Sequence, residues 1–170
     1  MQRILYLLRH AKSDWSQNVT DYERPLNERG KGSAEHMGRW MSQHDSMADL
    51  IVSSPATRAR LTASLVCAAT GYDEQAIDWD ERIYDASVTT LLDVLAGYTD
   101  SPESVMLIGH NPGFESLLRY LGGDSVAKHD SSKLMPTAAL ARLNMPSNWN
   151  ELDRGCAEVI SIIRPKELTK

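Results

Sequence analysis

Two histidines and two arginines lie at or shortly after the ends of apolar runs that are typical of buried strands. Arg9 and His10 end the first run, Arg58 lies shortly after the second, and His110 follows a later one. A single histidine after a strand is more often a capping or surface residue. In an α/β sheet, however, ligands bind outside the carboxyl ends of the strands. We therefore expect these four side chains to converge at one edge of a sheet.

These residue types suit phosphoryl transfer. The transferring group spreads negative charge over its equatorial oxygens, and catalysis depends mostly on positioning and on cationic hydrogen bonding. Arginine forks bind phosphate oxygens in a bidentate way and remain charged. A neutral imidazole nitrogen is a competent nucleophile near neutral pH. Amides at the helix starts near Thr57 and Gly113 would supply further donors to an anion.

The elements that must position these residues alternate along the chain. Apolar runs predict strands at 3–9, 49–53 and 104–109, a weaker strand at 77–83, and two final strands at 138–145 and 157–164. Helical spacing predicts helices at 27–44, 55–70, 88–95 and 112–121. This alternation predicts one α/β domain over residues 1–170, a three-layer sandwich with helices on both faces of a largely parallel sheet. The last two strands have no obvious helix between them, so we expect an antiparallel member.

The second helix carries local start and stop signals. Ser54 is expected to cap it, Pro55 to occupy its first position and Gly71 to end it. Its apolar face is expected to comprise Leu61, Leu65 and Ala68 or Ala69.

Composition excludes several classes of protein. The 170 residues carry a net charge of −5, which argues against broad nucleic-acid binding but permits a local basic pocket. No apolar run is long enough to span a membrane. The first apolar segment is too short for a signal peptide, so we expect a cytoplasmic protein. Cys67 and Cys156 form no CxxC pair and are expected to be small core residues.

Three motifs together resemble the histidine phosphatase superfamily, which is also called phosphoglycerate-mutase-like. Arg9-His10-Ala11 stands where that family has Arg-His-Gly, and Gly109 to Gly113 match its Gly-His-Asn-Pro-Gly motif. The family's second motif is matched by Ser54, Pro55, Arg58, Ala59, Thr62 and Ala63. Within the superfamily the chain is similar to SixA-type phosphohistidine phosphatases. That similarity rests on its short length, on Arg24-Pro25-Leu26 before Gly30, and on the segment 136–139.

The resemblance implies roles for individual residues. His10 would be the nucleophile that becomes phosphorylated, while Arg9, Arg58 and His110 would bind the phosphate oxygens. Arg24 is either part of the same basic rim or a solvated loop arginine. Glu81 lies where larger family members place a general acid, and the alternative is a surface carboxylate.

Other polar and aromatic residues have two interpretations each. Lys12 and Ser13 follow the nucleophile and either touch substrate or belong to a polar loop. Trp15 either lines the mouth of the pocket or packs elsewhere. Arg29 to Ser33 lack the spacing of a phosphate-binding loop and follow no strand. No histidine pair has zinc-protease spacing and no carboxylate cluster resembles a metal cage, so we expect neither metal nor other cofactor.

We therefore predict a metal-independent phosphatase that hydrolyses phosphohistidine on a partner protein and releases inorganic phosphate. A short chain leaves little sequence for a lid, and an open cleft would admit a protein side chain. Hydrolysis of a small phosphomonoester is the alternative, because one fold serves many substrates. A non-catalytic phosphate-binding module is a third hypothesis, which the presence of Arg9, His10, Arg58 and His110 disfavours. We expect neither nucleic-acid nor membrane partners.

Overall fold

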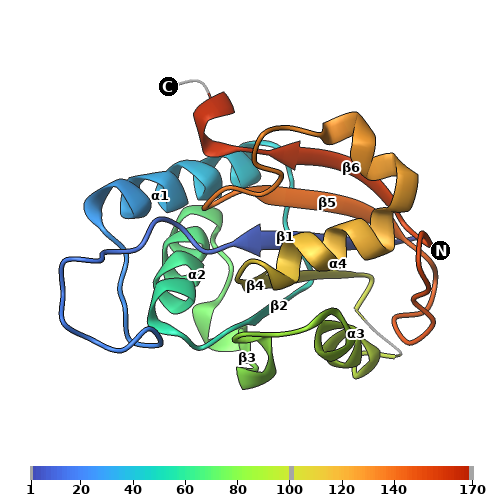
Figure 1. Cartoon of the computed structure of the whole chain (residues 1–170), viewed down its shortest axis with the longest axis horizontal. Helices are drawn as coiled ribbons and strands as arrows, with labels where there is room; N and C mark the ends of the chain where they lie inside the picture. The colour runs from blue at the N-terminus through green and yellow to red at the C-terminus, as the bar shows by residue number, and fades with distance from the viewer. Residues whose placement is uncertain (1, 100–101, 169–170) are drawn as a thin grey trace.

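A six-stranded mixed sheet forms the centre of the protein (Figure 1). The computed structural model describes residues 2–99 and 102–168. The strands are β1 (Arg3–Arg9), β2 (Leu50–Ser53), β3 (Asp78–Trp79), β4 (Ser104–Gly109), β5 (Leu140–Met145) and β6 (Glu158–Ile163). Their order across the sheet is β3-β2-β4-β1-β5-β6, and β5 runs antiparallel to both of its neighbours while the other pairs are parallel. The α/β class and the antiparallel member were therefore predicted correctly.

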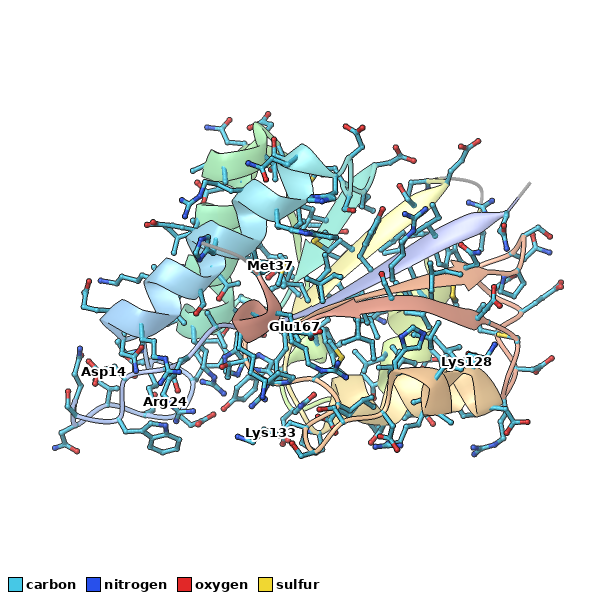
Figure 2. All side chains as sticks on the ribbon, turned by 90° about the horizontal axis from the view of Figure 1, so that it is seen from above. Asp14, Arg24, Met37, Lys128, Lys133 and Glu167 are labelled. Carbon is cyan, nitrogen blue, oxygen red and sulfur yellow. The ribbon has the colours of Figure 1, made fainter. Side chains whose placement is uncertain are left out.

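Helices cover both faces of this sheet. They are α1 (Glu28–Gln43), α2 (Thr57–Thr70), α3 (Val88–Ala96) and α4 (Gly113–Gly122), with short 3-10 helices η1 (Glu74–Ala76), η2 (Glu81–Ile83), η3 (Gly123–His129) and η4 (Pro165–Glu167). Alternate residues of β1 enter different cores: Leu5 and Leu7 pack with α3 and α4, whereas Tyr6 and Leu8 pack with α1 and α2. Figure 2 shows the two helical layers on opposite sides of the sheet. This alternation is why residues 4–8 of β1, between the two terminal arginines, are all apolar or aromatic. None of the helices described is long and apolar enough to cross a membrane.

The strand register brings three chain segments to one edge of the sheet. β1 and β4 are parallel with Arg9 opposite Gly109, and the His10 amide donates to the Gly109 carbonyl at 2.9 Å. The Ser54 amide donates to the Ile108 carbonyl, also at 2.9 Å, where β2 ends. The loops after β1, β2 and β4 consequently leave the sheet together, as the alternating pattern predicts.

Helix α2 differs from its predicted form. It begins at Thr57, and its N-cap residue Ala56 has no side chain that could cap it, so the expected Ser54 cap with Pro55 at the first position was wrong. The expected apolar face was also wrong, because Leu61 and Leu65 are only partly buried and Ala68 is exposed. Small residues face the sheet instead, together with two polar ones: Arg58, Ala59, Thr62, Ala63, Val66 and Cys67. Ala59, Ala63, Val66 and Cys67 pack in one core cluster with sheet residues and with Met37 and Met41 of α1, so contacts on two sides select this face.

Three of the predicted strands extend beyond the strands that the structure shows. The weak strand predicted at 77–83 contains only Asp78 and Trp79, because the Asp80 carboxylate accepts from the Arg82 amide and starts a 3-10 turn. β5 and β6 begin at Leu140 and Glu158 rather than at 138 and 157. Gly71 ends α2 in the left-handed conformation, as predicted.

Candidate active site

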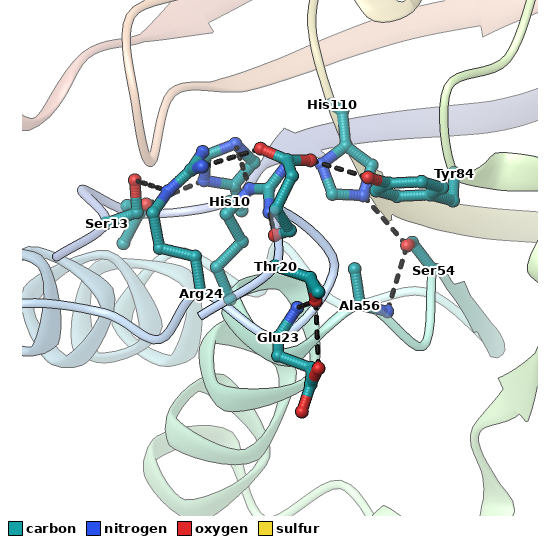
Figure 3. Close-up of polar contacts among 12 residues, drawn as sticks. His10, Ser13, Thr20, Glu23, Arg24, Ser54, Ala56, Tyr84 and His110 are labelled. Carbon is teal, nitrogen blue, oxygen red and sulfur yellow. Dashed lines mark hydrogen bonds and ion pairs between the residues drawn. The ribbon is translucent and has the colours of Figure 1, made fainter. Parts of the chain in front are cut away.

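A cavity of about 500 Å³ opens where the loops leave the carboxyl ends of β1, β2 and β4 (Figure 3). It is lined by Arg9, His10, Lys12, Ser13, Trp15, Asp21, Arg24, Arg58, Tyr84, Asp85, His110, Asn111 and Thr137. The structure thus brings together the four residues that the sequence singled out. Four of the lining residues are basic (Arg9, Lys12, Arg24 and Arg58) and two are acidic, so the cavity is electropositive although the chain is acidic.

His10 is buried and its orientation is fixed. Its Nδ1 lies 2.7 Å from the Ala11 carbonyl oxygen, which can only accept, so this nitrogen carries the ring proton. Nε2 then holds a lone pair, and it accepts a 3.4 Å hydrogen bond from Nε of Arg58. The pKa of His10 is lowered to about 3, chiefly by burial and to a smaller extent by the nearby His110, Arg58 and Arg9. The ring is therefore neutral at pH 7, with one nitrogen in the form that a nucleophile needs.

Arg58 is held in place from the first turn of α2. Its Nη1 donates to the Asp21 carbonyl at 2.6 Å, and its Nη2 lies 3.1 Å from the Asp21 carboxylate. Arg9 is anchored through Nη1 to the Met135 carbonyl at 3.1 Å. Its buried Nε has no hydrogen-bond partner among the residues described. Both guanidinium groups are thus oriented, and Arg9 retains a donor that an anion could satisfy.

His110 follows β4 and sits beside the nucleophile. The two imidazole centroids are 5.1 Å apart. Nε2 of His110 lies 2.8 Å from the Ser54 hydroxyl, while the buried Nδ1 has no partner in the described part of the chain. When the hydroxyl donates to Nε2, Nδ1 carries the proton and can donate to an anion. The pKa of His110 is lowered to about 4, chiefly by burial and next by the positive charge of Arg58.

Asp21 and Tyr84 are functional candidates that sequence reasoning missed. The Asp21 carboxylate accepts from the Tyr84 hydroxyl at 2.5 Å and from Arg24 at 2.5 Å, in addition to Arg58. These bonds, with that from Tyr84 the strongest, hold the pKa of Asp21 far below its usual range. Asp21 lies in the irregular segment between β1 and α1, and neither periodicity nor spacing marks it. Only its three-dimensional contacts identify it.

The rim of the cavity contains the residues for which the sequence left two alternative roles. Nε of Arg24 donates to the Ser13 hydroxyl at 3.0 Å, and its guanidinium carbon lies 3.7 Å from the centroid of the Trp15 ring. Trp15 is 77% exposed. The cavity wall includes Lys12, Ser13, Trp15 and Arg24. Contact of Lys12 and Ser13 with substrate stays a prediction. Arg24 is not a solvated loop residue.

Glu81 requires a correction. It is exposed in η2 and is not among the residues that line the cavity, so the structure favours the surface-carboxylate interpretation. The tight turn of η2 and the loop after it bring Tyr84 and Asp85 to the cavity instead. Within residues 2–99 and 102–168, no three histidine, cysteine, aspartate or glutamate side chains come together as possible metal ligands.

Comparisons with known proteins agree with this geometry. The family model for the histidine phosphatase superfamily (branch 1) matches residues 5–91. An uncharacterized protein of Mycobacterium tuberculosis is 31% identical over 163 residues, which cover 94% of this chain and all of the relative. Two solved structures are each named a "putative phosphohistidine phosphatase SixA". The one from Agrobacterium tumefaciens has 34% identity and a TM-score of 0.80, covering 96% of this chain and 98% of its own. The one from Nakamurella multipartitia has 28% identity and a TM-score of 0.79, covering 97% of each chain.

Proposed function

The chain belongs to the histidine phosphatase superfamily and is a phosphatase, and on this premise we propose that it hydrolyses phosphohistidine on a partner protein through phosphorylated His10. The main support for this proposal is the neutral, oriented ring of His10, which lies beside the fixed guanidinium groups of Arg9 and Arg58. The family relation does not name the substrate, because related sites serve many phosphorylated compounds. The chemistry of the leaving group supports the proposed substrate.

The reaction has two balanced steps. Nε2 of His10 attacks phosphorus, a new N–P bond forms, and the bond between phosphorus and the substrate nitrogen breaks. Water then attacks phosphorylated His10 and releases inorganic phosphate, which returns the lone pair to Nε2. Arg9 and Arg58 bind the equatorial oxygens of the phosphoryl group, and His110 donates a hydrogen bond to them.

The acid–base character of the cavity favours a leaving group that needs no proton. An alcohol leaves as an alkoxide unless a general acid protonates it. Asp21 is held ionised by Tyr84, Arg24 and Arg58 and is therefore a poor proton donor. Phosphohistidine whose ring is protonated at the other nitrogen leaves as neutral imidazole, whose conjugate acid has a pKa of only about 6.5. Such a substrate gains little from an enzyme-supplied proton.

A small phosphomonoester is the second candidate, and Asp85 favours it. This carboxylate lines the cavity and forms no ion pair among the residues described, so no cation holds it away from a leaving-group oxygen. The second candidate function assigns it the role of general acid. The deciding experiment compares kcat/KM for a phosphohistidine protein and for a panel of phosphomonoesters, measured side by side. Higher efficiency on the phosphohistidine protein is expected. Higher efficiency on one phosphomonoester would overturn the proposed substrate.

We expect catalysis to need no metal ion. The guanidinium charges of Arg9 and Arg58 act where a bound cation acts in many other phosphatases. Treatment with EDTA should therefore leave kcat unchanged. Complete loss of activity that added metal restores would contradict this expectation.

A further inference from the structure

A second cleft, of about 300 Å³, adjoins the catalytic cavity and shares Lys12 and Thr137 with it. Its lining contains five cationic residues, Lys12, Arg29, Lys133, Arg164 and Lys166, together with serine and threonine hydroxyls, and no carboxylate. We call it the basic cleft. It is built from four separate parts of the chain, namely the loop after β1, the start of α1, the segment before β5 and the segment after β6.

Most of this positive charge has no structural use. Arg164 supports the fold, because it donates to the Leu134 and His129 carbonyls and lies 3.5 Å from Glu167. The other four cations are exposed, and within the described residues none forms an ion pair. In a chain of net charge −5, grouping unpaired cations costs repulsion that a bound anion would offset.

The cationic side chains of the basic cleft differ from those of the catalytic cavity, and this difference indicates which anionic groups the cleft would bind. In the catalytic cavity, hydrogen bonds fix the guanidinium groups of Arg9 and Arg58. In the basic cleft, four of the five cations are exposed, and three of these four are lysines. Lysine is a compact point charge with rotatable donors on a flexible stem, so it can meet anionic groups at variable positions. Lys12 and Thr137 line both the catalytic cavity and the basic cleft, so a ligand in the basic cleft would lie next to a group bound at His10.

We propose that the basic cleft docks acidic side chains that flank the phosphohistidine on the partner protein. This inference rests on the proposed function, because it names the surroundings of that substrate. Complementary charge at the rim of an interface mainly raises the association rate and its sensitivity to salt. The acidic flank would thus raise kcat/KM without changing the chemistry at His10.

The test uses two synthetic phosphohistidine peptides of equal length, one with three glutamates beside the phosphohistidine and one with three glutamines. Exposed ion pairs contribute little each, so three should raise wild-type kcat/KM for the acidic peptide by about tenfold at low ionic strength. The preference should shrink with added salt. The variant Lys133→Glu/Lys166→Glu should abolish it and leave hydrolysis of free phosphohistidine unchanged.

The matched control is Lys128→Glu/Arg60→Glu. Both of its residues are exposed and line neither the basic cleft nor the catalytic cavity, and its change in net charge is identical. It should keep the preference for the acidic peptide. Equal wild-type kcat/KM on the two peptides would overturn the docking proposal alone, as would an equal loss of preference in both double variants. Failure of the wild type to hydrolyse either peptide or free phosphohistidine would overturn the proposed function and the docking proposal with it.

Discussion

His10 presents a neutral ring nitrogen to Arg58 while its other nitrogen is committed to the Ala11 carbonyl. We therefore expect the phosphoryl group to be trapped on His10 during turnover. The trapped label should be labile in acid and stable in base, as a phosphoramidate is. His10→Ala should take up no label. An acid-stable label, or full labelling of His10→Ala, would exclude this intermediate.

Arg58 combines a charge with a fixed direction, since Asp21 holds two of its nitrogens. Removing one preorganised donor from a transition state typically costs about 100- to 1,000-fold in kcat. Arg58→Ala should show a loss of that size. Arg60→Ala is the matched control, because Arg60 is exposed on the same helix and does not line the cavity. Similar rates for the two variants would show that Arg58 does not contact the phosphoryl group.

Asp21 is a positioning residue, and its substitution should act through Arg58 and Arg24. Asp21→Asn keeps the size of the side chain but removes the charge that orients both arginines. We expect KM to rise and kcat to fall less than in Arg58→Ala. The double variant Asp21→Asn/Arg58→Ala should then be no slower than Arg58→Ala, because the effects of coupled residues are not additive. Fully additive losses would mean that Asp21 acts independently of Arg58.

The carboxylates near the cavity can distinguish the two substrate classes. Glu81 lies outside the cavity, so Glu81→Gln should leave the rates on phosphohistidine and on alkyl phosphates unchanged. Asp85 lines the cavity, and Asp85→Asn should slow alkyl phosphates by about 100-fold or more while barely changing phosphohistidine. Single-turnover rates are required, so that product release does not hide the chemical step. Equal losses on both substrates would contradict a leaving-group effect.

At the scale of elements, the start of α1 supports the loop that carries the nucleophile. The Asn27 amide donates to the Lys12 carbonyl at 3.0 Å, and the Asn27 side chain caps α1 at Gly30. A Cβ on Gly30 would lie 2.1 Å from the Lys12 carbonyl oxygen, which is backbone and cannot move alone. Gly30 therefore permits close packing of α1 against the loop after His10.

Two glycines of α1 form a matched test of this packing. Gly30→Ala should lower the free energy of unfolding and also reduce kcat, because the loop after His10 must shift. A Cβ on Gly32 would meet nothing within 4 Å, so Gly32→Ala should stabilise the protein by up to about 1 kcal/mol and leave kcat unchanged. Urea unfolding and kinetics on both variants would check this. Equal stability changes would show that the close contact has no effect.

At the scale of the whole molecule, two buried neutral histidines make stability depend on pH. The folded pKa values are about 3 for His10 and about 4 for His110, below the usual value near 6.5. Below pH 6.5 the unfolded chain therefore binds protons that the folded chain does not. Above pH 6.5 the two histidines should not lower the unfolding free energy. On acidification below pH 6.5 the unfolding free energy should fall by about 1.4 kcal/mol per pH unit for each histidine.

Urea unfolding at pH 7.5, 6.5 and 5.5 measures this dependence. His110→Gln should have a shallower decline than the wild type, because one of the two titrating groups is gone. His36→Gln serves as the control, since His36 lies on α1 away from the catalytic cavity and should keep the full decline. A wild-type stability that does not change between pH 7.5 and 5.5 would contradict the neutral, buried state of both rings.

The amino-acid sequence by itself determined the sheet class, the strands β1 and β4, and the convergence of Arg9, His10, Arg58 and His110. These features follow from local signals: continuous apolar runs, chemical residue type, and the rule that parallel strands end at one edge. The sequence also indicated the buried face of α4, where large apolar residues recur at helical spacing and Phe114, Leu117, Leu118 and Leu121 are fully buried.

Only the tertiary structure decided which face of α2 is buried, where Asp21 lies, and that Glu81 is outside the cavity. Each depends on a contact between residues far apart in the chain. The buried face of α2 is the one that packs against both the sheet and α1. Asp21 becomes important because Tyr84, 63 residues later, donates to it. The basic cleft has the same origin: Lys12, Arg29, Lys133 and Lys166 are scattered single cations in the sequence, and only folding places them around one cleft beside the catalytic cavity.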